Sequence, residues 1–316
     1  MAKKKNLSKK ISQIAAIILG VILVCVFFYN ADTGLSLQDN LQNALSGKAV
    51  RQTGDFKPDN TGKFMLYTIS TGNSDSHLLV APGGEAMLVD AADNDDYSVI
   101  EATLEKYGVS EIDTLVSTHF DSDHIGSMDD VVENTKVDSA YISNYKDNTK
   151  DYRNLMNALK DKQIAPTVAQ SGMRFNLGGA SVEVLNPENK KYQEVNSACV
   201  ILKVSYGSTD FLLTGDMEEE ALDGLLNNWK DSIGCEVLKC AHHGSRSGIS
   251  DALLQAVRPQ IAVIPCGKNN SYGHPHKETL ALLQKYNVQT YRTDLDGDIA
   301  ILTDGNSIQT YTQAVQ

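Results

Sequence analysis

The sequence lacks the features of several common protein classes. Its five cysteines include no C-x-x-C pair, which argues against a zinc ribbon and against a redox-active dithiol. A chain of 316 residues can build a core without cross-links, so we expect the four cysteines beyond residue 30 to be buried apolar side chains rather than disulfides. No internal repeat is evident, and 41% hydrophobic residues exclude a disordered or fibrous chain.

Positive charge is scarce outside the N-terminus. The chain has a formal charge of −12, and residues 1–30 hold five lysines and no acid, so the remaining residues carry −17. A domain this acidic repels polyanions and has no broad basic surface for non-specific binding of nucleic acid. Any contact with DNA or RNA would therefore be made at a metal site or at a local patch.

The first sixty residues contain the one long hydrophobic run. Residues 11–29 carry no charge over nineteen positions and follow the lysine cluster. At 1.5 Å per residue this run spans a hydrocarbon core of about 30 Å, and the lysines place its N-terminal side in the cytoplasm. We predict a single-pass membrane anchor in residues 1–30, a polar linker in 31–62 and an extracytoplasmic domain in 63–316. The alternative is a cleaved signal peptide and a secreted domain, although no A-x-A site follows the run.

Beyond residue 62, short strand-like runs alternate with helix-like runs. This order predicts a layered α/β domain with mixed sheets. Strands are expected at 64–70, 78–81, 86–89, 115–117, 210–213, 236–239 and 261–265. Helices are expected at 97–107, 218–229, 251–257 and 277–286, and a closing hairpin at 298–311.

Residues capable of binding a metal follow several of these strands directly. The segment after strand 115–117 carries His119, Asp121, Asp123 and His124 within six positions. Two imidazoles and two carboxylates offer nitrogen and oxygen ligands to a divalent metal, whereas a single such residue is usually a solvated loop residue. An acidic turn with incidental histidines is the competing interpretation. It does not explain why similar residues follow the strands 210–213, 236–239 and 261–265.

These motifs resemble those of the metallo-β-lactamase superfamily, whose general pattern is H-x-H-x-D-H. Asp121 stands where the second histidine is usual, which is similar to the C-terminal domain of ComEC-type DNA-uptake proteins, with its pattern H-P-D-x-D-H-I-G-G. The matching positions in this segment are His119, Asp121, Asp123, His124, Ile125 and Gly126. Further matches lie at 212–216, 238–245 and 270–276, and the opening motif D-x-G-Q-G-D is reduced to Gly72 and Asp75 in 70–75. The resemblance implies the metallo-β-lactamase αββα sandwich, two mixed sheets flanked by helices.

The resemblance also implies a site with two divalent ions, zinc or manganese. His119 and Asp121 would serve one ion, Asp123 and His124 the other, and Asp216 would bridge them. One of His243 and His274 would complete the ligand set, and the other would act as an acid or contact the substrate, while Asp123 would orient the attacking water. Asn196 stands where the superfamily usually has another ligand, so one ion would be held more loosely. Residues expected to contact the substrate or to support the ligands are Asp75, Asn196, Lys239, His242, Asn270 and His276.

The function implied by the resemblance is hydrolysis of phosphodiesters, with nuclease activity on extracellular DNA or nucleotides. A hydrolase of another ester, lactone or β-lactam on the same fold is an alternative. The second alternative is a non-catalytic surface module that binds DNA or a protein. DNA or a nucleotide and the membrane are the partners that we expect, and no protein partner can be inferred.

Overall fold

The computed structural model describes residues 50–52 and 56–313. The predicted anchor at 11–29 and most of the predicted linker lie outside these residues. Within the described ranges, no helix combines the length and the hydrophobicity needed to cross a membrane. Part of the segment predicted as a linker joins the domain, because β1 (Val50–Gln52) pairs in parallel with β16 (Ile308–Gln313) and Phe56 is buried.

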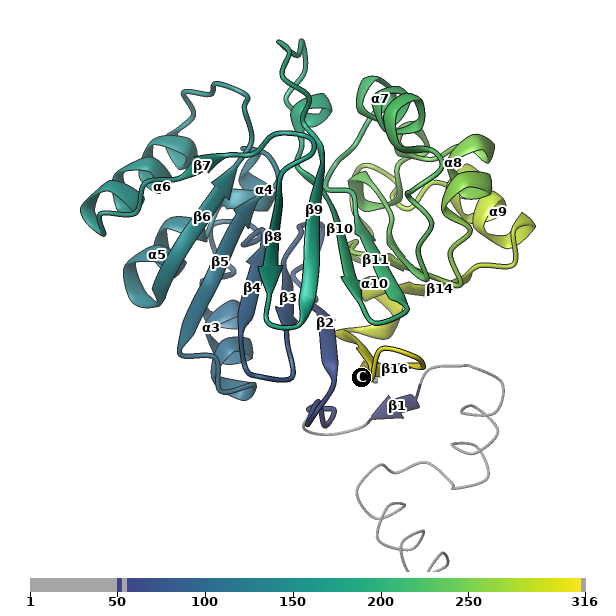
Figure 1. The fold of residues 1–316 in the computed structure, drawn as a ribbon, viewed down its shortest axis with the longest axis horizontal. Coiled ribbons are helices and arrows are strands. Elements are labelled where there is room, and N and C mark those ends of the chain that lie inside the picture. The colour runs from purple at the N-terminus through teal and green to yellow at the C-terminus, as the bar shows by residue number, and fades with distance from the viewer. Residues whose placement is uncertain (1–49, 53–55, 314–316) are drawn as a thin grey trace, which may run out of the picture.

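Two mixed β-sheets form the centre of the domain (Figure 1). The nine-stranded sheet has the order β1, β16, β15 (Ile299–Thr303), β2 (Phe64–Thr68), β3 (His77–Val80), β4 (Ala86–Val89), β5 (Glu111–Ser117), β6 (Lys136–Ile142) and β7 (Thr167–Val168). The seven-stranded sheet has the order β14 (Gln289–Arg292), β13 (Ile261–Ile264), β12 (Val237–Lys239), β11 (Thr209–Leu213), β10 (Ile201–Tyr206), β9 (Ala180–Asn186) and β8 (Arg174–Leu177).

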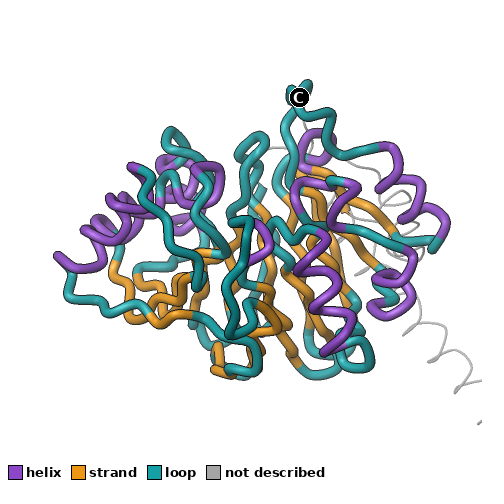
Figure 2. Tube along the Cα trace, turned by 90° about the horizontal axis from the view of Figure 1, so that it is seen from above, coloured by secondary structure: helices purple, strands orange, loops and turns teal. Residues whose placement is uncertain are grey.

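Helices cover the outer face of each sheet, and strands lie between them when the molecule is seen from above (Figure 2). The nine-stranded sheet is covered by α3 (Tyr97–Lys106), α5 (Met128–Asn134) and α6 (Lys150–Asp161). The seven-stranded sheet is covered by α7 (Glu219–Trp229), α8 (Asp251–Val257) and α9 (Lys277–Lys285). Shorter helices are α4 (Ser122–Ile125), α10 (Thr293–Asp296), η1 (Asn196–Ala198), η2 (His242–Gly244) and η3 (Arg246–Gly248).

Three apolar clusters hold these four layers together. The central cluster fills the space between the sheets, where Phe64 of β2 packs on Phe211 of β11 with ring centroids 5.7 Å apart. The two outer clusters join each sheet to its helices, for example through Leu104 of α3 and Leu225 of α7. Each helix buries only one face, as expected of helices at the surface of a layered domain. The predicted αββα sandwich of mixed sheets is therefore confirmed.

The strand directions bring one edge of each sheet together. In the nine-stranded sheet β4, β5, β6 and β7 are parallel, and in the seven-stranded sheet β11, β12, β13 and β14 are parallel. Strand β9 runs with β11, because both are antiparallel to β10. The amide of Val200, just before β10, donates to the carbonyl of Thr118, just after β5, at 2.7 Å. Loops that follow the carboxyl ends of both sheets thus meet at one edge.

The predicted helices and strands are all present, with bounds that shift by a few residues. The largest shift is in β5, which begins at Glu111 rather than at residue 115. The segment 128–206 was not assigned from the sequence, and it contains helices α5 and α6 and strands β6 to β10. The four cysteines beyond residue 30 are buried free thiols, as expected.

Candidate metal centre

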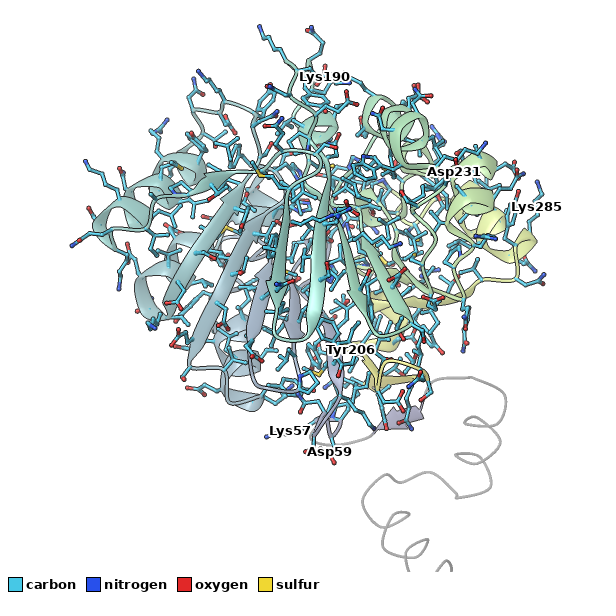
Figure 3. The ribbon with its side chains drawn as sticks, in the orientation of Figure 1. Lys57, Asp59, Lys190, Tyr206, Asp231 and Lys285 are labelled. Atoms are coloured by element: carbon cyan, nitrogen blue, oxygen red, sulfur yellow. The ribbon has the colours of Figure 1, made fainter. Side chains whose placement is uncertain are left out.

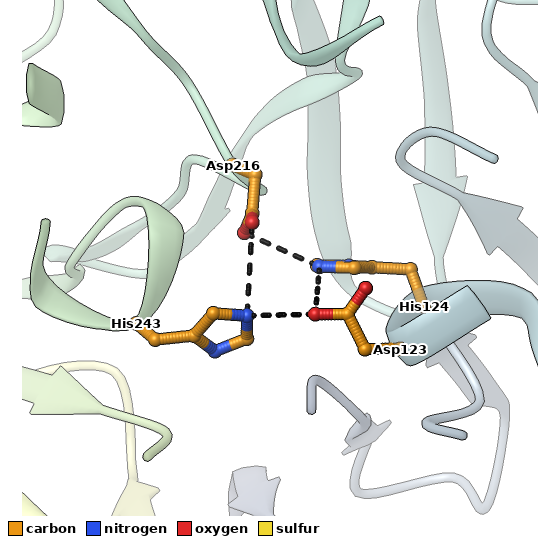
Figure 4. A group of neighbouring side chains, drawn as sticks. All are labelled: Asp123, His124, Asp216 and His243. Atoms are coloured by element: carbon orange, nitrogen blue, oxygen red, sulfur yellow. Dashed lines mark hydrogen bonds and ion pairs between the residues drawn. The ribbon is translucent and has the colours of Figure 1, made fainter. Parts of the chain in front are cut away.

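Four potential ligands converge at the edge where the ends of β5, β11 and β12 meet (Figure 4). Asp123 and His124 come from α4, Asp216 follows β11, and His243 lies in η2 after β12. The Nε2 atom of His124 lies 3.3 Å from Asp216 Oδ1, and the Nε2 atom of His243 lies 3.1 Å from Asp123 Oδ2. One ligand atom from each residue lies within 4.8 Å of the others. Side chains that are far apart in the sequence therefore face a single point.

The Nδ1 atoms of the two imidazoles face away from the centre of this group. His124 Nδ1 lies 2.8 Å from a carboxylate oxygen of Asp90, and His243 Nδ1 lies 3.1 Å from the carbonyl oxygen of Pro265. Both oxygens are acceptors, so each Nδ1 carries a proton, and once a ring gives up its second proton its Nε2 presents a lone pair to the group. His124 Nε2 and Asp216 Oδ1 are buried without a hydrogen-bond partner among the described residues. With both rings neutral, two imidazole nitrogens and two carboxylates face one another, an arrangement that fits a divalent cation.

His119 and Asp121 lie beside this group. His119 Nε2 is 3.5 Å from Asp121 Oδ2, and the rings of His119 and His124 have centroids 4.0 Å apart. His119 Nε2 is also buried without a hydrogen-bond partner among the described residues, and so is Oδ1 of Asn196 in η1. The arrangement suits the second ion that the sequence predicts, although neither His119 nor Asp121 belongs to the group of four.

The single turn of α4 depends on a close approach of two backbones. The amide of Gly126 donates to the carbonyl of Ala92 at 2.9 Å, and the amide of Ala91 donates to the carbonyl of His124 at 2.7 Å. A Cβ atom at Gly126 would lie 2.4 Å from the amide nitrogen of Asn94, so only glycine fits. The segment after β4 thereby holds the ligand-bearing turn in place.

Asp90 supports the site, and the sequence analysis missed it. Its carboxylate accepts hydrogen bonds from the amide of Thr118 at 2.7 Å and from His124 Nδ1 at 2.8 Å. Its backbone has φ of 60°, a left-handed conformation that costs about 1–3 kcal/mol for a residue with a side chain. Asp90 follows directly after the buried strand β4. The pattern that located the other ligands, a polar residue at the end of a buried strand, could therefore have located Asp90 as well.

A buried ion pair lies behind the ligands. Lys239, at the end of β12, is fully buried, forms an ion pair with the buried carboxylate of Asp75, and donates to the carbonyl of Gly215 at 2.8 Å. Asp75 Oδ1 also lies 3.4 Å from His243 Nδ1. Lys239 therefore cannot contact a substrate, and it supports the ligands together with Asp75. Burial opposes ionisation of Asp75, but Lys239 holds the pKa of this carboxyl well below its ordinary value.

Negative charge dominates the site. Burial disfavours a charge on His124, yet the carboxylates of Asp216 and Asp90 raise the pKa of its imidazole well above the ordinary value. Burial also disfavours a charge on His243, but the surrounding carboxylates, Asp216 first, raise its pKa to about 10. The formal charges at the site are those of one ammonium group and five carboxylates: Lys239, Asp75, Asp90, Asp121, Asp123 and Asp216. The four negative charges left over are the number that two divalent ions would balance.

The predicted residues of the segment 242–276 surround the centre in different roles. His242 Nδ1 lies 3.0 Å from Glu218 Oε1, which orients its Nε2 atom toward Asp216 at 3.6 Å. Asn270 binds the backbone of His274 through Nδ2 to the carbonyl at 2.6 Å and through Oδ1 to the amide at 3.0 Å, so its role is structural. The Nδ1 atom of His276 accepts from the amide of Arg246 at 3.1 Å.

His274 lies outside the group of four and is half-buried. Its ring centroid is 6.2 Å from that of His243, and the exposed ring of Tyr272 stacks on it at 5.7 Å. Burial and the neighbouring imidazoles lower the pKa of His274 to about 4, so the ring is neutral near pH 7. Of the two histidines predicted to complete the site, His243 is the one placed among the ligands.

Comparison with known proteins agrees with this geometry. Residues 70–268 match the family profile of the metallo-beta-lactamase superfamily. The chain belongs to this superfamily. Its members are metal-dependent hydrolases, and the lone pairs gathered around Asp216 are suited to such a metal.

The curated relatives confirm the resemblance to ComEC-type proteins. ComE operon protein 3 of Bacillus subtilis is 32% identical over 61% of this chain and 25% of its own length. Competence protein ComA of Neisseria gonorrhoeae is 28% identical over 63% of this chain and 26% of its own. Recombination protein 2 of Haemophilus influenzae is 26% identical over 63% of this chain and 23% of its own length. The matched part of this chain thus spans about a quarter of the length of these relatives.

A solved structure supports the superfamily fold. The metallo-beta-lactamase fold protein YhfI of Bacillus subtilis superposes with a TM-score of 0.52 at 12% identity and covers 76% of this chain and 100% of its own. At this identity the likeness shows the fold alone.

The buried pair should matter for stability. Lys239→Met leaves Asp75 as a buried carboxylate without its partner, so we expect a loss of about 3–5 kcal/mol in the free energy of unfolding. Asp75→Asn combined with Lys239→Met removes both charges and should recover most of this loss. Denaturant unfolding of the metal-free proteins measures the effect. The control is Lys285→Met, which breaks the exposed pair with Asp251 and should leave the free energy of unfolding nearly unchanged, because solvent screens this pair. A loss no larger than that of the control would contradict the role of the pair.

Metal affinity should depend on pH. In the metal-free protein the raised pKa values keep His124 and His243 protonated near pH 7, and a metal ion that binds their Nε2 atoms must displace these protons. Affinity for manganese or zinc should therefore rise with pH between about pH 6 and 8, by roughly tenfold per pH unit for each proton displaced. Calorimetry in two buffers of different ionisation enthalpy counts the released protons. Affinity that does not change with pH would disprove this assignment.

Proposed function

We propose that the protein is a metal-dependent phosphodiesterase that hydrolyses DNA or nucleotides outside the cytoplasm. The observation that carries the proposal is the ligand group of two carboxylates and two imidazoles, Asp123, His124, Asp216 and His243, in a chain whose relatives are named for competence and recombination. Mixed oxygen and nitrogen ligation suits manganese as well as zinc.

Two divalent ions would be held by this group and by His119 with Asp121, and they would supply the Lewis acidity that activates water and neutralises charge on a phosphate. The chain itself supplies the groups that orient the reactants. The side chain of Asp123 is about one-third exposed (32%), and one of its oxygens lies 3.1 Å from His243 Nε2. Its pKa is lowered despite burial, so it stays ionised and can accept a hydrogen bond from the attacking water.

His274 is assigned to the substrate. It lies next to the ligands without joining them, and Asn270 holds its backbone from both sides. A neutral imidazole there can donate a hydrogen bond to a phosphate oxygen or to the leaving group. His243 is held by Pro265 and Asp75 with Nε2 toward Asp123, and this orientation supports its proposed role as a metal ligand.

The proposed location of the domain outside the cytoplasm depends on the uncharged hydrophobic run at residues 11–29. As an uncleaved anchor it would hold the domain at the outer face of a membrane, and its cleavage would release a secreted enzyme.

A substrate screen tests the proposal. The purified protein, loaded with manganese or with zinc, is incubated with single-stranded DNA, bis(p-nitrophenyl) phosphate, a β-lactam and a simple ester. We expect turnover of the DNA and of the small phosphodiester. If both stay intact with either metal while the lactam or the ester is consumed, the protein is a hydrolase of another class. If no substrate is turned over, the non-catalytic module is favoured.

Two variants in the same assay separate metal binding from substrate contact. Asp123→Ala with His124→Ala removes two ligands from the group of four, so phosphodiester hydrolysis should fall to background. His274→Ala should keep the metal and lose roughly 10²–10⁴-fold in kcat, the usual contribution of a positioned acid or base. Turnover retained by the double variant would refute the site assignment.

A further inference from the structure

A cavity of about 640 Å³ lies between the loop after β6 and the loop after β9. Asn144, Tyr145 and Lys146 of the first loop line it, and residues 190–193 of the second face them, including two further lysines. No carboxylate is among the lining residues, although the chain beyond residue 30 has a strong excess of acids. The cavity, which we call the lysine groove, is therefore a local reversal of charge suited to an anion.

The lysine groove lies on the same edge of the domain as the metal centre. Strand β6 is the parallel neighbour of β5, and β9 runs with β11, so both loops follow carboxyl ends at the edge that carries His119 and Asp216. The hydroxyl of Ser143 donates to the carbonyl of Ala198 at 2.7 Å, which joins the first loop to η1. Lys190 is seen at this upper edge, whereas Lys57 lies at the opposite edge (Figure 3). A strand bound in the groove would therefore lie on the same edge of the domain as the metal centre.

The groove is held in shape by its own polar contacts. Asn144 Nδ2 donates to the carbonyl of Glu188 at 3.0 Å and ties the two loops together. The hydroxyl of the buried Tyr192 donates to Asn186 Oδ1 at 3.0 Å and accepts from the amide of Glu188 at 2.7 Å. Tyr145 is half-buried and packs against the outer core of the nine-stranded sheet. Walls that are held in place before binding lower the cost of ordering a ligand in the groove.

Two of the three lysines in the groove carry a charge that no carboxylate compensates, so they can bind an anionic ligand. Lys190 lies 3.3 Å from Glu220 and 3.7 Å from Glu188, so its charge is already compensated. Lys146 and Lys191 are exposed, and neither forms an ion pair with any residue in the described part of the chain. The neighbouring Asp147 is occupied by the amides of Asn148 and Thr149 at the start of α6.

We propose that the lysine groove binds phosphates of a single-stranded nucleic acid through Lys146 and Lys191, on the edge of the domain that also carries the metal centre. The inference rests on the proposed function and specifies its substrate as a strand rather than a mononucleotide. The volume lies within the range of about 300–1,000 Å³ usual for small ligands, which suits a short stretch of a flexible strand. An acidic protein segment is the competing ligand.

The test compares two double variants of the full chain in detergent, loaded with manganese. Lys146→Gln with Lys191→Gln removes both available charges of the groove. Lys57→Gln with Lys285→Gln removes the same charge at the opposite edge and on α9, where Figure 3 places those residues. The substrates are a single-stranded oligonucleotide and bis(p-nitrophenyl) phosphate, each measured over a range of salt concentrations.

For the groove variant we expect KM for the oligonucleotide to rise about tenfold. The slope of log KM against log salt should decrease by about 1.4, since each phosphate contact on a single strand contributes roughly 0.7. Turnover of the small diester should not change, and the control variant should behave as the wild type. These results together would show that the groove binds the single-stranded nucleic acid.

Other outcomes distinguish failure of the groove proposal from failure of the proposed phosphodiesterase function. If the groove variant matches the wild type on the oligonucleotide while both cleave the small diester, the groove proposal is overturned and the phosphodiesterase stands. If the wild type cleaves neither substrate, the proposed function fails, and fluorescence anisotropy of a labelled oligonucleotide then decides on the groove alone. Equal anisotropy titrations for wild type and groove variant overturn it. Loss of polyglutamate binding, with oligonucleotide binding unchanged, reassigns the groove to an acidic protein segment.

Discussion

Buried negative charge at one edge of the sandwich is the constraint on which the site depends. Asp75, Asp90 and Asp216 are buried, and Asp123 and Asp121 lie beside them. A buried carboxylate is stable only when a cation or several donors accompany it. Lys239 accompanies Asp75 and Thr118 donates to Asp90, whereas Asp216 Oδ1 has no hydrogen-bond partner among the described residues and lies 3.7 Å from the shared ammonium of Lys239. The domain therefore requires additional positive charge at this point, which protons on His124 and His243 or divalent ions can provide.

The fold supplies the geometry that concentrates this charge. Strands β4, β11 and β12, from two sheets, end at one edge, and each continues into a short segment that contains a residue with positive φ. Asp90, His242 and His243 all have positive φ, and Gly215, which precedes Asp216, has φ of 49°. Backbone strain of this kind persists where packing and hydrogen bonds over-determine it. Much of the edge is thus organised to aim ligands rather than to gain stability.

The parts of the fold and site that could be predicted are those with a local signature. Short apolar runs followed directly by His or Asp located β5, β11 and β12 and their ligands. The strands β8 to β10 escaped because their exposed positions are polar and their partners are set by tertiary pairing. The burial of Lys239 could not be read from the sequence, because its partner Asp75 comes from a distant strand end. The available lysines of the groove were likewise hidden within a chain whose overall charge is negative.

The central claim is that this edge is built for two divalent ions. The most direct measurement is the metal content of the purified protein by mass spectrometry, after dialysis against manganese or zinc and removal of free metal at neutral pH. The account predicts about two ions per chain. It also predicts that Lys285→Met, a substitution remote from the site, leaves this ratio unchanged. A ratio near zero for the wild type with both metals would contradict it.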